Sequence, residues 1–125
     1  MLALMATLGL VSDLVAGTAA GTLVPQTVAF TSSKETALKR ALFEMREAID
    51  RYYLDHKRYP ENLKTLQKGR YIARIPRDPF TGRNSSWRPT RATLSARGRR
   101  QRVGIYDVKS GSKRTALDGT RYSDW

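Results

Sequence analysis

The sequence contains no cysteine and only one histidine, His56. The lack of cysteine excludes a disulfide framework, a thiolate metal site and a cysteine nucleophile. Zinc binding is disfavoured too, because zinc ligands are mostly cysteine and histidine. Fewer than about a hundred residues remain for a globular part once an apolar N-terminal stretch is set aside, so a small and modestly stable domain is expected.

Charge is almost absent from the first 33 residues, where Asp13 is the only ionised side chain. Every lysine and arginine lies from Lys34 onward, and the whole chain carries a formal charge of +12 with a pI near 10.6. Such a charge favours attraction to nucleic acid, anionic lipid or an acidic partner, without specifying which. The sequence therefore divides into an apolar segment, residues 1–31, and a basic domain, residues 32–125.

Residues 1–31 are long enough to cross a bilayer as a helix, and a retained membrane helix is the interpretation we favour. Asp13, several glycines and Pro25 interrupt the apolar pattern. A cleaved secretory signal is a second interpretation, because Ala16–Ala20 consists of small residues, although no basic stretch precedes it. A third is that the segment is buried within the protein.

An amphipathic helix is predicted to begin, or to restart after the apolar segment, at Ser32 or Ser33 and to end near Arg58. Ser32–Glu35 has the Ser-x-x-Glu spacing of a capping box, and Pro60 prevents continuation of the helix. Its apolar residues recur at helical spacing and predict one core-facing stripe: Leu38, Ala41, Leu42, Met45, Ala48, Ile49 and Tyr52. The spacing also predicts solvated ion pairs along the helix, namely Glu35 with Lys39, Arg46 with Asp50, and Glu47 with Arg51.

The rest of the chain predicts short elements. Residues 61–69 indicate a two-turn helix with Gly69 at its C-terminal cap, and Ile75 and Phe80 are expected to fill the core. Residues 85–90 and 103–110 are the best strand candidates and are expected to pair as antiparallel neighbours. The five arginines of residues 91–102 favour a mobile loop. Residues 111–125 are predicted to form a second loop, held in place by Leu117, Tyr122 and Trp125.

Motifs for catalysis are largely missing. Ser110–Lys113 matches the Ser-x-x-Lys motif of acyl enzymes, but it lies in a Gly-Ser loop rather than on a helix. His56 has no evident partner and is expected to be a surface residue near a helix end. No phosphate-binding glycine loop and no carboxylate pair suited to acid–base chemistry occurs. The sequence thus predicts a protein that is not an enzyme.

Nucleic-acid binding is an alternative from a different functional class. The loop arginines could contact phosphates, with Trp87 or Tyr106 available for stacking on bases. These arginines are Arg91, Arg97, Arg99, Arg100 and Arg102. A solvated basic loop explains the same arginines without any ligand, so we expect a protein partner rather than nucleic acid.

Four motifs, in order, resemble those of the major pseudopilins of type II secretion systems. The first two lie on the predicted long helix and at its end, Lys34-Glu35-Thr36-Ala37-Leu38 and the run from Ile49 to Pro60. The others are Ile75-Pro76-Arg77-Asp78-Pro79-Phe80-Thr81-Gly82 and the C-terminal run from Gly104 to Trp125. The resemblance covers residues 34–125. The arginine-rich stretch departs from it, since the family would place a neutral or acidic linker there. A pilin-like protein of a DNA-uptake machine would combine the resemblance with nucleic-acid binding.

The resemblance implies an α+β pilin-like fold, in which a long N-terminal helix packs on a small antiparallel sheet with a short second helix and a C-terminal loop. It implies a filament subunit held in the bacterial inner membrane, with its head domain in the periplasm. Its partners would be other pseudopilin subunits and an inner-membrane assembly platform. The filament would help export folded proteins across the outer membrane.

The resemblance also implies a calcium ion in the C-terminal loop. Asp107, Ser110, Asp118 and Asp124 supply oxygen ligands of the kind that calcium requires. Lys113 and Arg114 place two positive charges in the same loop and oppose cation binding. An equally open interpretation is that these aspartates and serines only form turns.

Overall fold

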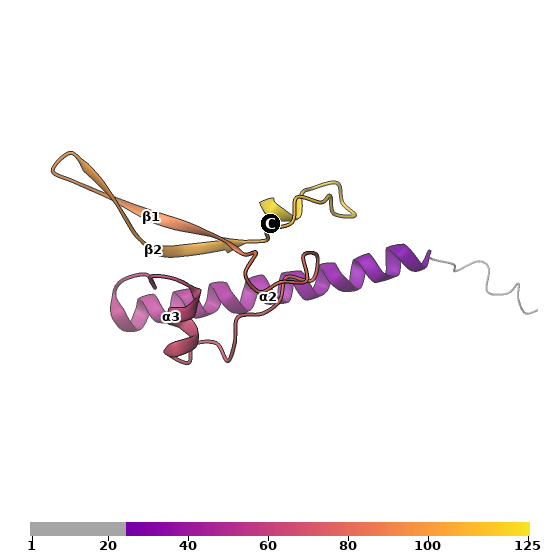
Figure 1. Ribbon diagram of the computed structural model, residues 1–125, viewed down its shortest axis with the longest axis horizontal. Helices are drawn as coiled ribbons and strands as arrows, with labels where there is room; N and C mark the ends of the chain where they lie inside the picture. Colours follow the sequence, from indigo (N-terminus) through magenta and orange to yellow (C-terminus); the bar gives the residue numbers. More distant parts are fainter. Residues whose placement is uncertain (1–24) are drawn as a thin grey trace, which may run out of the picture. The chain divides into compact units, whose positions relative to one another are not determined.

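The computed structural model describes residues 25–125, apart from the side chains of Ala96, Arg100, Gln101 and Arg102. It is an α+β structure, in which the long helix α2 (Gln26–His56) packs on a two-stranded antiparallel sheet (Figure 1). The chain divides after Phe30, and the fold described below is that of Thr31–Trp125. The predicted membrane segment, residues 1–31, lies almost entirely outside the described residues.

Helix α2 begins at Gln26, six positions before the predicted capping box. Pro25 precedes it, and its carbonyl accepts the first helical hydrogen bond, from Ala29 N at 3.1 Å. Proline suits this end of a helix because its ring fixes a helical φ and the amide that it lacks would have no partner there. The prediction of a start at Ser32 or Ser33 was therefore wrong, whereas the predicted end is confirmed to within two residues. Within residues 25–125 no helix is both long and apolar enough to span a membrane.

The predicted apolar stripe of α2 is confirmed, because all seven of its residues are buried. Toward the middle of the helix it packs on Trp87, Val108, Ala116 and Tyr122, and toward the C-terminal end on Leu66 and Ile105. Complete burial of one such aliphatic side chain is worth about 1.5–3 kcal/mol. The stripe is thus the main attachment of the helix to everything that follows it.

The short helix α3 (Leu63–Lys68) matches the prediction for residues 61–69. The side chain of Asn62 accepts a hydrogen bond from Thr65 N at 3.0 Å, which satisfies one of the free amides of the first turn. Ile75 and Phe80 pack partly buried against the core, as expected. His56 is exposed at the end of α2, as predicted, and its ring stacks on Tyr52 with centroids 4.0 Å apart.

The predicted strands pair in antiparallel fashion as β1 (Arg88–Ala96) and β2 (Arg99–Lys109). The expected mobile loop at residues 91–102 is instead most of this hairpin. Only Arg97 and Gly98 form the turn, with φ values of 52° and 76°. Positive φ at both turn residues gives a backbone twist that matches that of paired strands, so the two-residue connection favours a hairpin over a loop.

Two bulges bend β2. Thr90 pairs with Asp107 and Arg91 pairs with Ile105, so Tyr106 has no partner on β1. Ala92 then pairs with Val103, so Gly104 also has no partner. Gly104 has a φ of 49°, and a Cβ there would lie 2.6 Å from Cβ of Tyr59. Glycine is required because the loop after α2 presses directly on this strand. Ile105 N also donates to Pro60 O at 2.8 Å, which fixes the loop to the outer edge of β2.

Residues 110–125 form the C-terminal segment, which includes the short 3₁₀ helix η3 (Tyr122–Asp124) and a bridge between Thr115 and Arg121. The predicted anchors differ in their burial. Tyr122 is 1% exposed and Trp125 packs partly buried on the core, whereas Leu117 is 50% exposed and is not part of the core.

Candidate functional site

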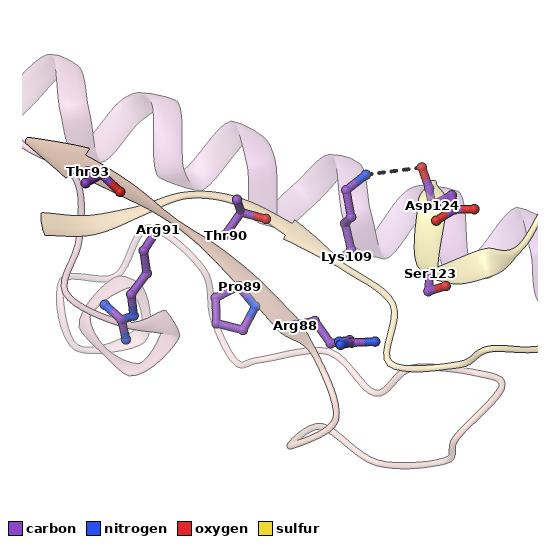
Figure 2. Close-up of a pocket in the computed structure, with 8 residues that line it drawn as sticks. All are labelled: Arg88, Pro89, Thr90, Arg91, Thr93, Lys109, Ser123 and Asp124. Atoms are coloured by element: carbon purple, nitrogen blue, oxygen red, sulfur yellow. Dashed lines mark hydrogen bonds between the residues drawn. The ribbon is translucent and has the colours of Figure 1, made fainter. Parts of the chain in front are cut away.

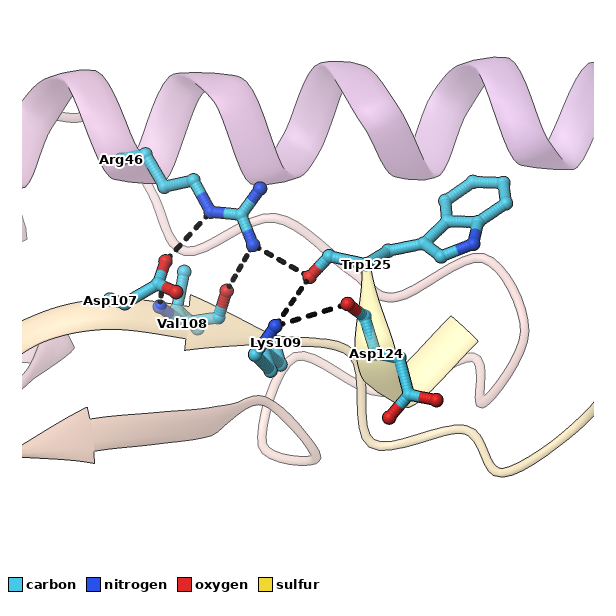
Figure 3. Close-up of polar contacts among 6 residues, drawn as sticks. All are labelled: Arg46, Asp107, Val108, Lys109, Asp124 and Trp125. Carbon is cyan, nitrogen blue, oxygen red and sulfur yellow. Dashed lines mark hydrogen bonds and ion pairs between the residues drawn. The ribbon is translucent and has the colours of Figure 1, made fainter. Parts of the chain in front are cut away.

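Arg46 joins the middle of α2 to both the sheet and the C-terminal segment (Figure 3). Its Nε donates to Oδ1 of Asp107 at 2.8 Å, and its Nη2 donates to the main-chain oxygens of Val108 and Trp125 at 3.0 and 2.7 Å. Lys109 Nζ donates to the same Trp125 oxygen at 3.2 Å. Among the side chains that the structure describes, Arg46 and Asp107 form the only salt bridge, so the ion pairs predicted along α2 were wrong.

Glu35, near the start of the buried stripe, forms a second attachment. Its Oε1 accepts hydrogen bonds from Leu117 N at 2.7 Å and from the hydroxyl of Tyr122 at 2.9 Å. Burial, followed by the bond to the Glu35 carboxylate, raises the pKa of Tyr122 to about 12. The ring of Tyr122 stacks on Phe80 with centroids 3.8 Å apart. The C-terminal segment is therefore held at two points on one helix.

The carboxylate of Asp78 is completely buried and organises the loop between α3 and β1. It accepts hydrogen bonds from Phe80 N at 2.8 Å, from Ser110 Oγ at 2.5 Å and from Gly111 N at 3.3 Å. A buried carboxylate is stable only when donors surround it, and here three do. The Asp78-Pro79-Phe80-Thr81-Gly82 motif thus connects this loop to the start of the C-terminal segment.

The calcium candidates have other partners in this structure. Asp107 is bonded to the positive guanidinium of Arg46, and Ser110 is buried on Asp78. Asp118 accepts two hydrogen bonds from Thr120, which lower the pKa of its carboxyl group. Asp124 is exposed, and its main-chain oxygen accepts from Lys109. Over residues 25–125 no three His, Cys, Asp or Glu side chains gather as a possible metal site, and calcium binding stays a prediction.

The basic candidates lie on the hairpin. Arg91, Arg97 and Arg99 are exposed, whereas Arg100 and Arg102 lie on β2 with side chains outside the described part. Arg91 Nη1 donates to Glu61 O at 2.9 Å. Together with Arg88 and Lys109 it lines an open hollow of about 620 Å³ along β1 (Figure 2).

The two aromatic candidates for stacking have different environments. Trp87 is 6% exposed and donates from Nε1 to Pro76 O at 2.7 Å, so it cannot stack on a base, and that prediction was wrong. Tyr106, which is 47% exposed, can still do so.

The sequence reasoning missed the roles of Arg46, Glu35 and Asp78. Arg46 directly follows the buried Met45, which was a signal that its side chain could reach the sheet rather than solvent. Glu35 lies one helical turn before Leu38 and borders the same stripe. For Asp78 the only signal was a turn-forming motif, which gives no indication of burial.

Comparisons with protein families, with characterised proteins and with solved structures found no match to this chain.

Proposed function

We propose that this protein is a non-enzymatic filament subunit similar to a type II secretion pseudopilin, anchored in the bacterial inner membrane with its head domain in the periplasm. The four ordered motifs support this proposal. The run Ile49–Pro60 ends α2 and presses on β2, while the Asp78 motif and the C-terminal run meet through Ser110 and Gly111.

The observation that carries the proposal is that α2 exposes two large apolar side chains on its side away from the core, with the charged Glu47 and Asp50 between them. Phe43 and Leu54 are 61% and 64% exposed, opposite the buried stripe. They are eleven positions apart, about three helical turns, and therefore lie on one face. Large exposed apolar side chains on one face mark an interaction surface, and a neighbouring copy of α2 would cover them in a filament.

Cysteine cross-linking in cells tests subunit contact directly, because the chain has no cysteine of its own. Phe43→Cys and Leu54→Cys, combined in one chain, should give a ladder of disulfide-linked oligomers under oxidation. The matched control combines Gln67→Cys on α3 with Lys113→Cys in the C-terminal segment, both at exposed positions, and should give none. Absence of a ladder in the Phe43 and Leu54 variant, with the protein present in the membrane, would contradict the filament.

Fractionation tests the location. In a Gram-negative host, the chain with a C-terminal tag should be in the inner-membrane fraction, and protease should remove the tagged head only from the periplasmic side. A soluble cytoplasmic protein would contradict the membrane anchor and would strengthen the nucleic-acid alternative. That alternative predicts a DNA affinity that falls steeply with salt.

The proposal includes calcium, on the resemblance alone. Its test is thermal unfolding of the wild-type protein with calcium and with a chelator. A calcium-dependent rise in Tm that Asp118→Asn and Asp124→Asn both abolish would support the site. Equal Tm values in calcium and chelator would remove it from the proposal.

A further inference from the structure

A groove of about 770 Å³ lies between the C-terminal end of α2 and the hairpin. One wall is the last turn of α2 and the loop after it, and the other is the bulged part of the strands. Its principal lining residues are Tyr53, Lys57, Arg58, Tyr59, Leu94 and Val103. The groove is distinct from the Phe43 and Leu54 face and from the hollow along β1.

The groove is apolar and accessible along its length. Leu94 is 60% exposed and Tyr53 is 40% exposed, although Tyr53 directly follows the buried Tyr52. The rings of Tyr53 and Tyr59 are 4.6 Å apart between centroids, and Tyr59 is 6.1 Å from Tyr106, which is also exposed. Within the groove, Tyr53, Tyr59 and Leu94 leave apolar surface exposed to water, which is the usual mark of a recognition site.

The rim of the groove is positively charged. Lys57 and Arg58 follow α2 directly, and Lys57 has a φ of 57°, so the chain turns sharply away from the helix axis there. Neither side chain has an acidic partner within the described residues. Glu61 is the one carboxylate in the lining; it forms no salt bridge with Lys57 or Arg58, and against these two cations it leaves the lining with a net positive charge. The groove therefore combines an apolar floor with an unneutralised basic rim.

We infer that this groove binds an acidic peptide segment of another protein, inserting an aromatic or branched aliphatic side chain between Tyr53 and Leu94 while flanking carboxylates meet Lys57 and Arg58. Charge complementarity favours an acidic partner. The aliphatic part of the floor favours insertion of an apolar side chain over insertion of a nucleic-acid base. A base stacks best on flat parallel rings, but the rings of Tyr53 and Tyr59 are inclined by 33°, and Leu94 offers no π-face. The inference does not depend on filament formation.

Fluorescence anisotropy of a labelled peptide on the purified full-length chain tests the inference. The probe is a short peptide with a central Phe-Leu pair flanked on both sides by Asp and Glu. Two control peptides replace the Phe-Leu pair by Ser-Ser, or all acidic residues by their amides. The acidic apolar peptide should bind with a Kd on the order of 10 µM, and each control should bind at least about tenfold more weakly.

Single substitutions locate the binding to the groove. Leu94→Ser and Arg58→Gln should each weaken binding of the probe about fivefold to tenfold. The matched controls are Leu117→Ser, an exposed leucine of the C-terminal segment, and Arg74→Gln, an exposed arginine away from the groove. Each control should leave the Kd within about twofold of wild type.

Two results would overturn the inference. One is that the probe does not bind, or binds with the same Kd after Leu94→Ser and Arg58→Gln. The other is that a labelled oligothymidylate binds more tightly than the probe, with a steep salt dependence, and competes with it for the same site. The second result would assign the groove to single-stranded nucleic acid. Cross-linking at positions 43 and 54 tests the filament independently of peptide binding, so either proposal can fail while the other holds.

Discussion

Arg46 Nε lies 2.8 Å from Oδ1 of Asp107, a residue 61 positions later in the chain. The same guanidinium also donates to the main-chain oxygens of Val108 and Trp125. One planar side chain therefore joins the helix, the sheet and the end of the C-terminal segment. Arginine suits this position because its rigid donors can serve several acceptors at once, which a lysine ammonium cannot do in the same geometry.

Replacing Arg46 should loosen the C-terminal segment more than the rest of the fold. Arg46→Met should lower the free energy of unfolding by about 1–3 kcal/mol, since hydrogen bonds to charged groups are lost while the side chain remains of similar length. Arg46→Lys should recover less than half of this loss. Hydrogen exchange should quicken mainly in residues 110–125. An equal effect from Arg40→Met, at an exposed position on α2, would show that the network is not the cause.

The Tyr122 hydroxyl should make stability fall in alkali. Its pKa is raised to about 12 in the folded protein from an ordinary 10.0. Its contribution to the free energy of unfolding is therefore complete below about pH 10 and is lost as the pH rises from about 10 to 12. Tyr122→Phe should cost about 1 kcal/mol at neutral pH through the lost bond to Glu35, and should flatten the alkaline decline. Urea denaturation at several pH values measures both effects.

Tyr71 provides the comparison for this prediction. Its hydroxyl donates to Asp55 at 2.6 Å, a bond that raises its pKa to about 12, but the group lies near the surface. Tyr71→Phe should not change the part of the alkaline loss of stability that depends on Tyr122. If Tyr122→Phe and wild type lose stability equally between about pH 10 and 12, burial of Tyr122 has no influence on its ionisation.

Asp78 should be among the most sensitive positions. Asp78→Ala would leave three donors without their acceptor, the part-buried Phe80 and Gly111 amides and the buried Ser110 hydroxyl, at a cost of about 3 kcal/mol or more. Ser110→Ala should cost less, because Asp78 would keep both amides. Thermal unfolding of the two variants checks the order, and a larger loss for Ser110→Ala would contradict the assignment of Asp78 as the centre of this network.

The contact between Gly104 and Tyr59 should be intolerant of a side chain. Gly104→Ala combines a positive φ with a Cβ placed 2.7 Å from Tyr59 O, and should cost about 2–4 kcal/mol. Gly82 also has a positive φ, of 73°, but an added Cβ there meets nothing within 4 Å. Gly82→Ala should therefore cost only about 1 kcal/mol, the backbone term alone. Equal losses in urea denaturation would mean that β2 yields to the added methyl group.

Local patterns in the sequence predicted those elements whose causes are local. The stripe of α2 follows from helical periodicity, and its seven residues are buried as expected. Helix α3 follows from Leu63 and Leu66, one turn apart, and from Gly69 at its C-terminal cap, whose effects are confined to one or two turns. The pairing of the two strands was predicted from alternation in residues 85–90 and 103–110, where aromatic and β-branched side chains are frequent.

The hairpin arm and the polar network were decided by tertiary structure. Composition favoured a loop at residues 91–102 because arginine, serine and glycine are weak strand formers. Strand pairing supplies backbone hydrogen bonds that composition does not reveal. Arg97 and Gly98 reverse the chain within two residues and bring the strands together. Arg46 has Asp50 at helical spacing and still bonds to Asp107. A surface pair at that spacing is worth only a few tenths of a kcal/mol, whereas the half-buried arrangement adds two main-chain acceptors. The sequence by itself thus determined which side of α2 faces the core, and the packed fold determined which of its charged residues would bind the rest of the chain.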